Sequence, residues 1–350
     1  MNEVTMTSAF AGGSLVGEAR RSAQASDLLP GAVDFLFGAS SWDDRCLTLT
    51  ASPDLVARRS VLLLFEEKGE TGRAQANDAI LREYFSQRGG AVDELKGRSE
   101  DIEQIWPRVA ALLTRTWEEK GEALDILVDL SACPLYLSLA LLATGMGAGL
   151  IREARFVYNE AEYPDQRPDL FTRGSWEAVA VPGFVGALNP GRERFYVVSV
   201  GFEGPKTLRF VNRADPDRVA ILFPKPGYRA DYPDRTWKQN ESLFEDYDIR
   251  DLDGSDVVCA PAGDAISAWH ALSRFARKGI TDENVYYLCC GPKPHSLALA
   301  LRSMQDGSGV VVYPKPLGHR ESGIRPTEEY WMYTIQDRSI PPLGTPGDGR

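Results

Sequence analysis

The chain contains two copies of one sequence pattern, and no other feature restricts its possible folds as strongly. The first copy covers about residues 34–164 and the second about residues 195–313. Four blocks match in the same order, and the offset between matched residues drifts only as far as loop insertions and deletions allow. A repeat of this length is too long for a solenoid, whose unit has roughly 20–50 residues. The pattern therefore predicts two similar domains with a pseudo-symmetric groove between them.

Matched residues indicate which positions of the two copies are equivalent. If the domains share one strand order, superposing them should bring Gly38 onto Gly201 and Pro134 onto Pro292, each in the loop after an equivalent strand. The full set of expected pairs is Gly38 with Gly201, Phe65 and Gly69 with Phe223 and Gly227, Asn77 with Asn240, Pro134 and Ser138 with Pro292 and Ser296, and Tyr158 with Tyr313.

The length of 350 residues agrees with two domains, because one hydrophobic core stops growing at roughly 250–300 residues. A stretch rich in Pro, Gly and Arg separates the copies and is expected to be a connector. Near the N-terminus only a short helix around residues 17–25 is expected. The expected division is a flexible N-terminal segment 1–30, a first Rossmann-like domain 31–164, a connector 165–194, a second Rossmann-like domain 195–340 and a flexible tail 341–350.

Within each copy, short apolar runs alternate with amphipathic segments of helix length, which is the pattern of βαβ units around a parallel sheet. Strands such as VLLLF and YVVSV are almost continuously apolar, as expected where helices cover both faces. The predicted fold class is α/β, with two tandem Rossmann-like domains, each a mainly parallel sheet with helices on both faces. The expected strands are 34–38, 60–65, 91–95, 125–130 and 155–158, then 196–201, 218–223, 247–251, 285–289 and 309–313.

Composition narrows the possible environments and partners. A net charge of −11 argues against general binding to a nucleic-acid backbone, which needs a concentrated basic face. Five cysteines, including the adjacent Cys289 and Cys290 in an apolar run, indicate buried thiols in a reducing compartment. The longest apolar stretch is too short for a bilayer, and the first thirty residues lack a signal-peptide pattern. We therefore expect a cytoplasmic protein without a membrane partner.

Ligands of open α/β sheets bind beyond the carboxyl ends of the strands, so the loops after the first strands are candidates. SSWDDR follows the first strand of copy one and contains Arg45, and FEGPK follows that of copy two, after Gly201, and contains Glu203 and Lys206. Each loop combines an acid and a base at a helix start, where free N–H groups can hold an anion. The alternative is a helix cap with an exposed base beside it.

The loops after the fourth strands form the second group of candidates. SACP begins with Ser131, whereas GPKPH contains Gly291, Lys293 and His295 and leads into Ser296. Gly291 lets a ligand approach the backbone, and Lys293 can reach a phosphate. Because copy one has no matching lysine, anion binding is expected to be asymmetric and concentrated in the second half.

A basic segment of the second copy completes the set. It contains Lys225 and Arg229 before Asn240, and interleaved aromatic residues make base stacking an alternative to a solvated loop. Its aromatic residues are Tyr228, Tyr232 and Trp237. The candidate ligand-binding residues are Arg45, Ser131, Gly201, Glu203, Lys206, Lys225, Arg229, Asn240, Gly291, Lys293, His295 and Ser296.

Signals for catalysis are weak. The chain has three histidines and lacks the GxSxG, HExxH, Walker A and GxGxxG motifs. No catalytic residue, metal or cofactor is therefore expected. An enzyme of nucleotide or phosphoester chemistry stays an alternative, with Glu203 or Asp44 acting beside His295. A purely structural subunit, with a filled and apolar groove, is the other alternative.

The segments ILVDLSACPLYLSLAL and YYLCCGPKPHSLALAL resemble the fourth strand and following helix of the CARF superfamily, in which a polar loop at this place contacts a cyclic oligonucleotide. Two such units in one chain resemble the SAVED arrangement of bacterial antiviral sensors. The resemblance implies a ligand-sensing or adaptor subunit of a prokaryotic defence system. A nucleotide-type ligand, such as a cyclic oligonucleotide, would bind in the groove. Because no effector domain is recognisable in this chain, it would act through a partner protein.

Overall fold

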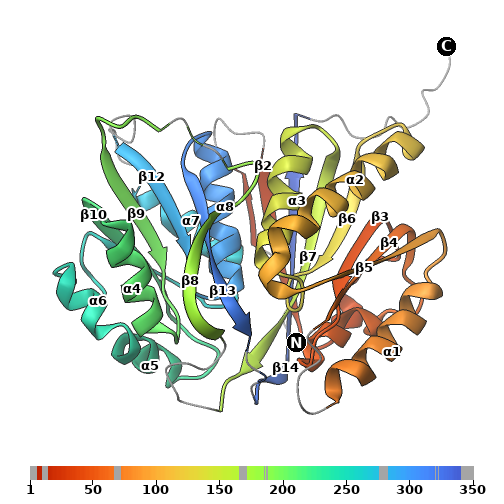
Figure 1. The fold of residues 1–350 in the computed structure, drawn as a ribbon, viewed down its shortest axis with the longest axis horizontal. Coiled ribbons are helices and arrows are strands. Elements are labelled where there is room, and N and C mark those ends of the chain that lie inside the picture. The colour runs from red at the N-terminus through yellow and green to blue at the C-terminus, as the bar shows by residue number, and fades with distance from the viewer. Residues whose placement is uncertain are drawn as a thin grey trace.

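The computed structural model describes residues 6–9, 15–66, 72–164, 172–184, 186, 188–275, 283–319, 321 and 323–339. Two α/β halves stand side by side, each built on a mainly parallel sheet between layers of helices (Figure 1). The predicted fold class is confirmed. The helices α3 (Leu135–Gly147) and α8 (Lys293–Asp306) pack against each other where the halves meet.

The two sheets share one order of five parallel strands, with the first strand in the middle. In the first half the order is β5-β4-β3-β6-β7, and in the second it is β11-β10-β9-β12-β13. The duplication that the sequence predicts is therefore present in the topology. The strands are β3 (Ala32–Ala39), β4 (Val56–Phe65), β5 (Ala91–Gly97), β6 (Leu124–Asp129) and β7 (Ile151–Glu162), then β9 (Glu193–Ser199), β10 (Arg218–Pro224), β11 (Val257–Ala260), β12 (Glu283–Cys289) and β13 (Val310–His319).

Helices cover both faces of each sheet because the strands carry apolar side chains on both sides. In β3, for example, Phe35, Leu36 and Phe37 are all fully buried, although successive side chains point to opposite faces. Besides α3 and α8, the helices are η1 (Ala25–Asp27), η2 (Asp44–Ala51), α1 (Arg73–Ser86), η3 (Ser99–Asp101), α2 (Ile102–Lys120), α4 (Gly204–Ala214), α5 (Tyr232–Gln239), α6 (Glu241–Asp246), α7 (Ala265–Ala271) and η4 (Leu272–Phe275). Among the described residues, no helix combines the length and apolar character that crossing a membrane requires.

Helix caps and strand faces identify equivalent residues of the two halves. Pro134 and Pro292 are the N-cap residues of α3 and α8, so their expected equivalence is confirmed. Phe37 and Val197 each lie two residues before the end of the central strand, and both belong to the core cluster that the halves share. Phe37 and Val197 are therefore equivalent.

The expected match of Gly38 with Gly201 is wrong. Gly38 lies inside β3, one residue beyond Phe37, and is equivalent to Val198, whereas Gly201 lies three residues further along, past the end of β9. The two glycines serve different purposes. A Cβ on Gly38 would approach the Phe85 ring to 2.7 Å, whereas one on Gly201 would meet the backbone of the neighbouring loop at 3.2 Å.

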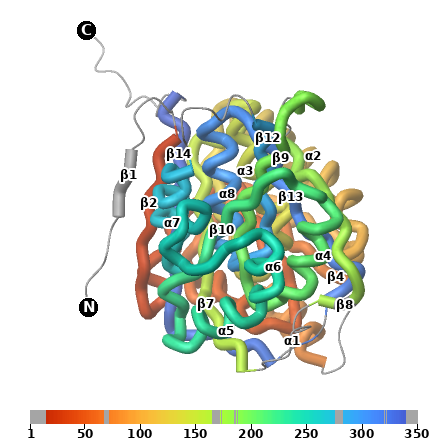
Figure 2. Tube along the Cα trace, turned by 90° about the vertical axis from the view of Figure 1, so that its left-hand side faces the viewer, coloured from red at the N-terminus to blue at the C-terminus, as the bar shows by residue number. Residues whose placement is uncertain are grey.

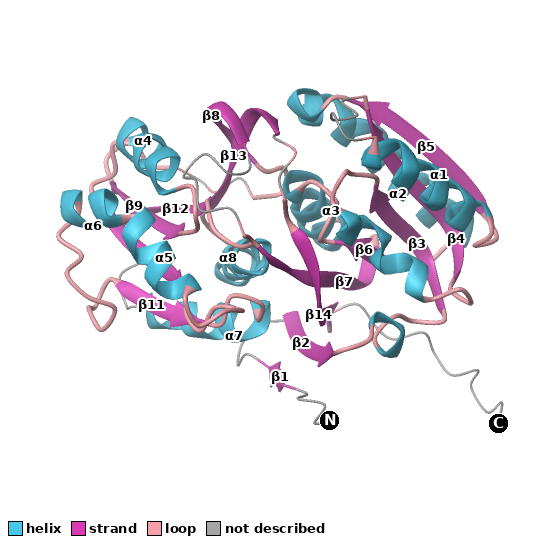
Figure 3. Ribbon diagram, turned by 90° about the horizontal axis from the view of Figure 1, so that it is seen from below, coloured by secondary structure: helices cyan, strands magenta, loops and turns pink. Residues whose placement is uncertain are grey.

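Each half completes its sheet with a strand that the other half supplies. β8 (Thr172–Ala180) follows β7 in the chain but pairs antiparallel with β13 of the second sheet. β14 (Arg325–Asp337) follows β13 but pairs antiparallel with β7 of the first sheet. Figure 3 shows β8 beside β13, and β14 between β7 and β2. We call this reciprocal arrangement the strand exchange.

The strand exchange changes the expected division of the chain. The expected connector 165–194 contains β8, which belongs to the second sheet, and the expected second domain contains β14, which belongs to the first. The expected flexible segment 1–30 contains β1 (Met6–Ala9) and β2 (Leu15–Ser22), which extend the first sheet beyond β14. The expected helix at 17–25 is therefore wrong over most of its length. The expected tail 341–350 lies outside the described residues.

One expected strand is also misplaced. Residues 247–251 form the turn after α6, and the third strand of the second half is the later run Val257–Ala260. Asp248, at the centre of the turn, has a φ of 53°. Such a left-handed backbone is incompatible with an extended strand.

A cleft between the two halves

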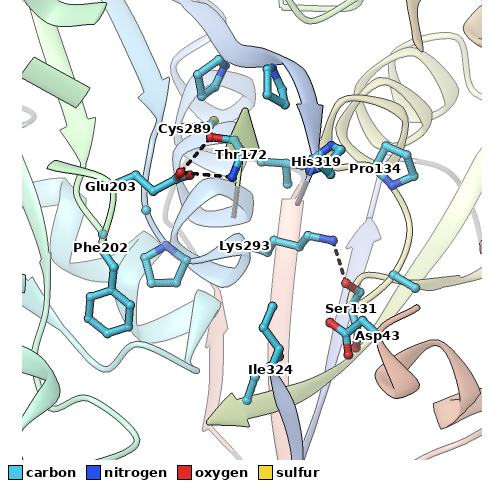
Figure 4. Close-up of a pocket in the computed structure, with 18 of the residues that line it drawn as sticks. Asp43, Ser131, Pro134, Thr172, Phe202, Glu203, Cys289, Lys293, His319 and Ile324 are labelled. Carbon is cyan, nitrogen blue, oxygen red and sulfur yellow. Dashed lines mark hydrogen bonds between the residues drawn. The ribbon is translucent and has the colours of Figure 1, made fainter. Parts of the chain in front are cut away.

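A cavity of about 1010 Å³ lies between the halves, beyond the carboxyl ends of both parallel sheets. The loops after the first and fourth strands of both halves contribute to its wall, as the sequence predicts. Of the twelve candidate residues, six belong to this wall (Figure 4). They are Arg45, Ser131, Gly201, Glu203, Gly291 and Lys293.

Lys293 joins the two halves. It begins α8 of the second half, and its ammonium group donates hydrogen bonds to three backbone carbonyls of the first half, those of Leu130 at 2.9 Å, Ser131 at 2.7 Å and Cys133 at 2.8 Å. Figure 4 shows the side chain reaching across to Ser131. A lysine ammonium has three hydrogens. All three hydrogens are used in these bonds. Lys293 therefore bridges the two halves and has no free hydrogen for a phosphate.

The bridge lies in a group of buried charges. Burial lowers the pKa of Lys293, and the positive charge of Arg45 lowers it further. Burial also raises the pKa of Asp129, at the end of β6. Oδ1 of Asp129 accepts a hydrogen bond from the Ser131 amide at 2.9 Å, whereas its buried Oδ2 has no partner among the described residues.

Arg45 is a second cation whose charge is largely compensated. Its guanidinium group binds the Asp43 carboxylate, with Nη2 2.7 Å from Oδ2, and Nη1 donates to the Asn159 carbonyl at 3.3 Å. Burial opposes the ionisation of Asp43, but Arg45 outweighs it and lowers the pKa of that carboxyl group. Both partners are buried or nearly so, which makes the pair a fixed part of the wall.

Glu203 and Lys206 also form a closed network. Oε1 of Glu203 accepts hydrogen bonds from the Thr172 amide at 3.2 Å and hydroxyl at 2.7 Å (Figure 4). Lys206 Nζ lies 2.9 Å from the same oxygen and donates to the Thr172 carbonyl at 2.6 Å. Glu203 is the N-cap residue of α4, but its side chain makes no cap hydrogen bond and anchors β8 instead. The capping alternative, which also expects an exposed base, is wrong for this loop, because the Lys206 side chain is only 13% exposed. Lys206 does not belong to the cavity wall.

The five other candidates lie outside the wall. His295 is fully buried, its Nε2 is 3.0 Å from the Pro261 carbonyl, and burial lowers its pKa to about 4. Ser296 binds the carbonyl of Pro292 within α8. Lys225 is exposed, and Arg229 pairs with Asp231 at the surface. Asn240, the fifth, is buried.

The recurring asparagines have a structural purpose. Asn77 Nδ2 donates to the Ser41 carbonyl at 2.9 Å, and Asn240 Nδ2 donates to the Gly201 carbonyl at 2.7 Å. Each side chain therefore holds the loop after the first strand of its own half. The repeat preserves a support of the cleft at these positions, not a ligand contact.

Aromatic side chains form a large part of the wall, and sequence reasoning found only some of them. Tyr163, Phe202 and Tyr232 contact one another, with ring centroids 5.2 to 6.1 Å apart. Tyr228 also lines the cavity, whereas Trp237 packs on Phe244 elsewhere. Tyr163 was missed because it lies at the end of the first copy, outside the loops that the fold rule selects.

Charged side chains of both signs line the cavity, and acids outnumber bases. The bases are Arg45, Arg98 and Lys293, and the acids are Asp43, Glu100, Glu160, Glu203 and Glu321. The cleft is therefore open and rich in aromatic rings, but it is not a basic groove.

No known family model matches the chain, and no curated protein is significantly similar to it in sequence. The resemblance to the CARF and SAVED proteins consequently stays a prediction from two short segments. At the level of structure, the chain contains two Rossmann-like halves.

Proposed function

We propose that this protein is a ligand-sensing or adaptor subunit that holds a nucleotide-type ligand in the cleft between its halves. The observation that carries the proposal is the cavity of about 1010 Å³, walled by aromatic side chains at the carboxyl ends of both sheets. Open α/β sheets bind ligands at this place, and bases stack readily on aromatic rings. A role in antiviral defence and an effector partner are supported by the sequence resemblance alone.

The charges favour a ligand with few phosphates. Lys293 and Arg45, two of the three cations that the described residues place in the wall, already bind carbonyl groups and a carboxylate. A ligand with many phosphates would meet more carboxylates than free cations. A mononucleotide or a small cyclic dinucleotide therefore suits the cleft better than a larger cyclic oligonucleotide.

The two alternatives receive less support. The enzyme hypothesis pairs Glu203 or Asp44 with His295, but His295 is buried outside the cavity wall, and Asp44 is bound by Arg73 and Asn77. The structural-subunit hypothesis expects a filled, apolar groove. A cavity of this volume with eight charged residues in its wall is neither.

Isothermal calorimetry tests the proposal with a panel of nucleoside monophosphates and cyclic dinucleotides. We expect at least one of them to bind the wild type, and Phe202→Ala to weaken that binding about 5-fold or more, because stacking on an aromatic ring contributes roughly 1–3 kcal/mol per base. Tyr247→Ala is the matched control, since Tyr247 is a half-buried aromatic residue outside the cavity wall. If no member of the panel binds at millimolar concentration, the proposal is wrong.

A chromatographic assay of the same mixtures addresses turnover. The proposal expects the bound nucleotide to be recovered intact. Steady product formation by the purified chain would favour an enzyme instead. Since the suggested base is His295, loss of that product in His295→Ala would identify the chemistry.

A further inference from the structure

Glu160 is a buried acid of the cleft whose hydrogen bonding is incomplete. It lies near the end of β7, is only 8% exposed and belongs to the cavity wall. Its Oε1 accepts a hydrogen bond from Trp331 Nε1 at 2.9 Å. Its Oε2 accepts none from any residue that the structure describes, and that oxygen is not among the fully enclosed ones.

The position of the carboxyl group is well determined. A Cβ on Gly263 would come within 1.8 Å of Oε1, so the residue at 263 must be glycine to leave room for it. On the other side the Trp331 indole holds the same oxygen. With Oε1 fixed in this way, Oε2 is the atom of Glu160 that a molecule in the cavity can reach.

No cation in the described part of the chain neutralises Glu160. The nearest base along β2 is Arg21, which lies 3.3 Å from Glu329 and is bound to that carboxylate instead. Burial accordingly raises the pKa of Glu160 to about 7. A buried acceptor that receives no hydrogen bond raises the free energy of the folded protein. A ligand that donates a hydrogen bond to Oε2 would remove this penalty.

The surroundings indicate what kind of donor fits. Tyr163 follows three residues after Glu160, and together with Phe202 and Tyr232 it forms one aromatic cluster of the wall. Flat rings bind to such side chains through their faces. A ring held there can present an amino group from its edge to a neighbouring carboxylate.

We infer that Glu160 Oε2 accepts a hydrogen bond from an amino group on the ring of the ligand, so that the cleft selects an amino-substituted base over its oxo counterpart. The inference rests on the proposed function, because it names the class of base that the proposed nucleotide site prefers. A binding site rejects an analogue strongly when that analogue leaves a buried polar group of the site without its hydrogen bond.

The decisive comparison is between adenosine 5′-monophosphate and inosine 5′-monophosphate, which share ribose and phosphate. Their rings differ in the amino or oxo group at position 6 and in the hydrogen that N1 carries beside the oxo group. By calorimetry at pH 8, above the pKa of about 7 to which burial raises Glu160, the carboxylate is ionised and only accepts hydrogen bonds, and the wild type should bind the amino form about 10-fold or more tightly than the oxo form. In Glu160→Gln the amide oxygen can still accept from Trp331, and its NH₂ group then faces the ligand. We expect the preference to vanish or reverse in this variant.

Glu162→Gln is the matched control. It removes a carboxylate of the same strand that is outside the cavity wall and lies 3.7 Å from Arg229, so the preference should persist. Circular dichroism and tryptophan fluorescence establish that each variant is folded. Equal wild-type affinities for the two nucleotides, or an unchanged preference in Glu160→Gln, overturn the inference while nucleotide binding stands. Failure of every nucleotide in the panel to bind overturns the proposed function itself.

Discussion

At the scale of single residues, the cations of this cleft bind carbonyl and carboxylate groups of the protein itself. Lys293 is the clearest example, because its three hydrogen bonds cross from one half to the carbonyls of the other. Those carbonyls belong to the loop that follows β6. Without the ammonium group, these partly buried carbonyl oxygens would lose this hydrogen-bond donor.

We therefore predict that Lys293→Met lowers the free energy of unfolding by about 2–4 kcal/mol, since hydrogen bonds from a charged donor are lost and their acceptors are left unpaired. Urea denaturation followed by circular dichroism measures the change. Lys225→Met is the control, because Lys225 is exposed and its loss should have no measurable effect. Equal stability of Lys293→Met and the wild type would show that the bridge contributes nothing to folding.

The same residue shows how far site prediction from sequence reaches. Lys293 was placed correctly in the cleft, because the rule about strand ends depends only on topology. Its bonding partners were not predictable, since they belong to a loop about 160 positions earlier in the chain. The incomplete bonding of Glu160 was equally hidden, because it depends on Trp331 of β14, a strand that sequence reasoning did not find.

At the scale of elements, β2 shows how a strand at the N-terminus ties the halves together. It pairs with β14 in the first sheet and packs on α7 of the second half (Figure 2). The contact is close because Gly17 has no side chain. A Cβ at that position would lie 2.7 Å from Cδ1 of Ile266 and 2.9 Å from Cζ3 of Trp269.

Gly17→Ala is accordingly expected to destabilise the fold by about 1–3 kcal/mol, the usual cost of overpacking a core. Thermal unfolding followed by tryptophan fluorescence would detect it, because the buried Trp269 is part of the contact. Gly31→Ala is the matched control, with no atom within 4 Å of the added methyl group. Equal losses in both variants would argue that the effect is not one of packing.

Elements inside the repeat were easier to predict than elements outside it. Most parallel strands of the copies contain a short apolar run, and the alternation of such runs with segments of helix length located nine of the ten expected strands. β8 was missed for a physical reason, because its buried Trp176 lies among exposed neighbours and no apolar run marks the strand. β14 does contain a run of large side chains, Tyr330–Tyr333, but it lies beyond the second copy, where the repeat indicated no strand.

At the scale of the whole molecule, the halves share one hydrophobic core. A single cluster of buried side chains extends from Phe37 of the first sheet, through Leu139 of α3 and Leu299 of α8, to Val197 of the second sheet. The strand exchange adds backbone pairing in both directions. Neither half can therefore lose its structure without exposing the core of the other.

We predict that the chain unfolds in one cooperative transition. Circular dichroism and tryptophan fluorescence should give coincident curves, and the calorimetric and van't Hoff enthalpies should agree. Two separate transitions would contradict the shared core and would assign the halves independent stabilities.

The strand exchange has a consequence for a chain of half this length. Such a chain, with one copy of the pattern, would end in a sixth strand that finds no place in its own sheet, as β8 does not join β7. Two molecules could satisfy each other only by trading these strands, and they would form an intertwined homodimer. The present chain has the architecture of that homodimer with its subunits joined end to end. Because the two halves belong to one chain, their association is intramolecular and does not depend on protein concentration, whereas a homodimer would dissociate on dilution.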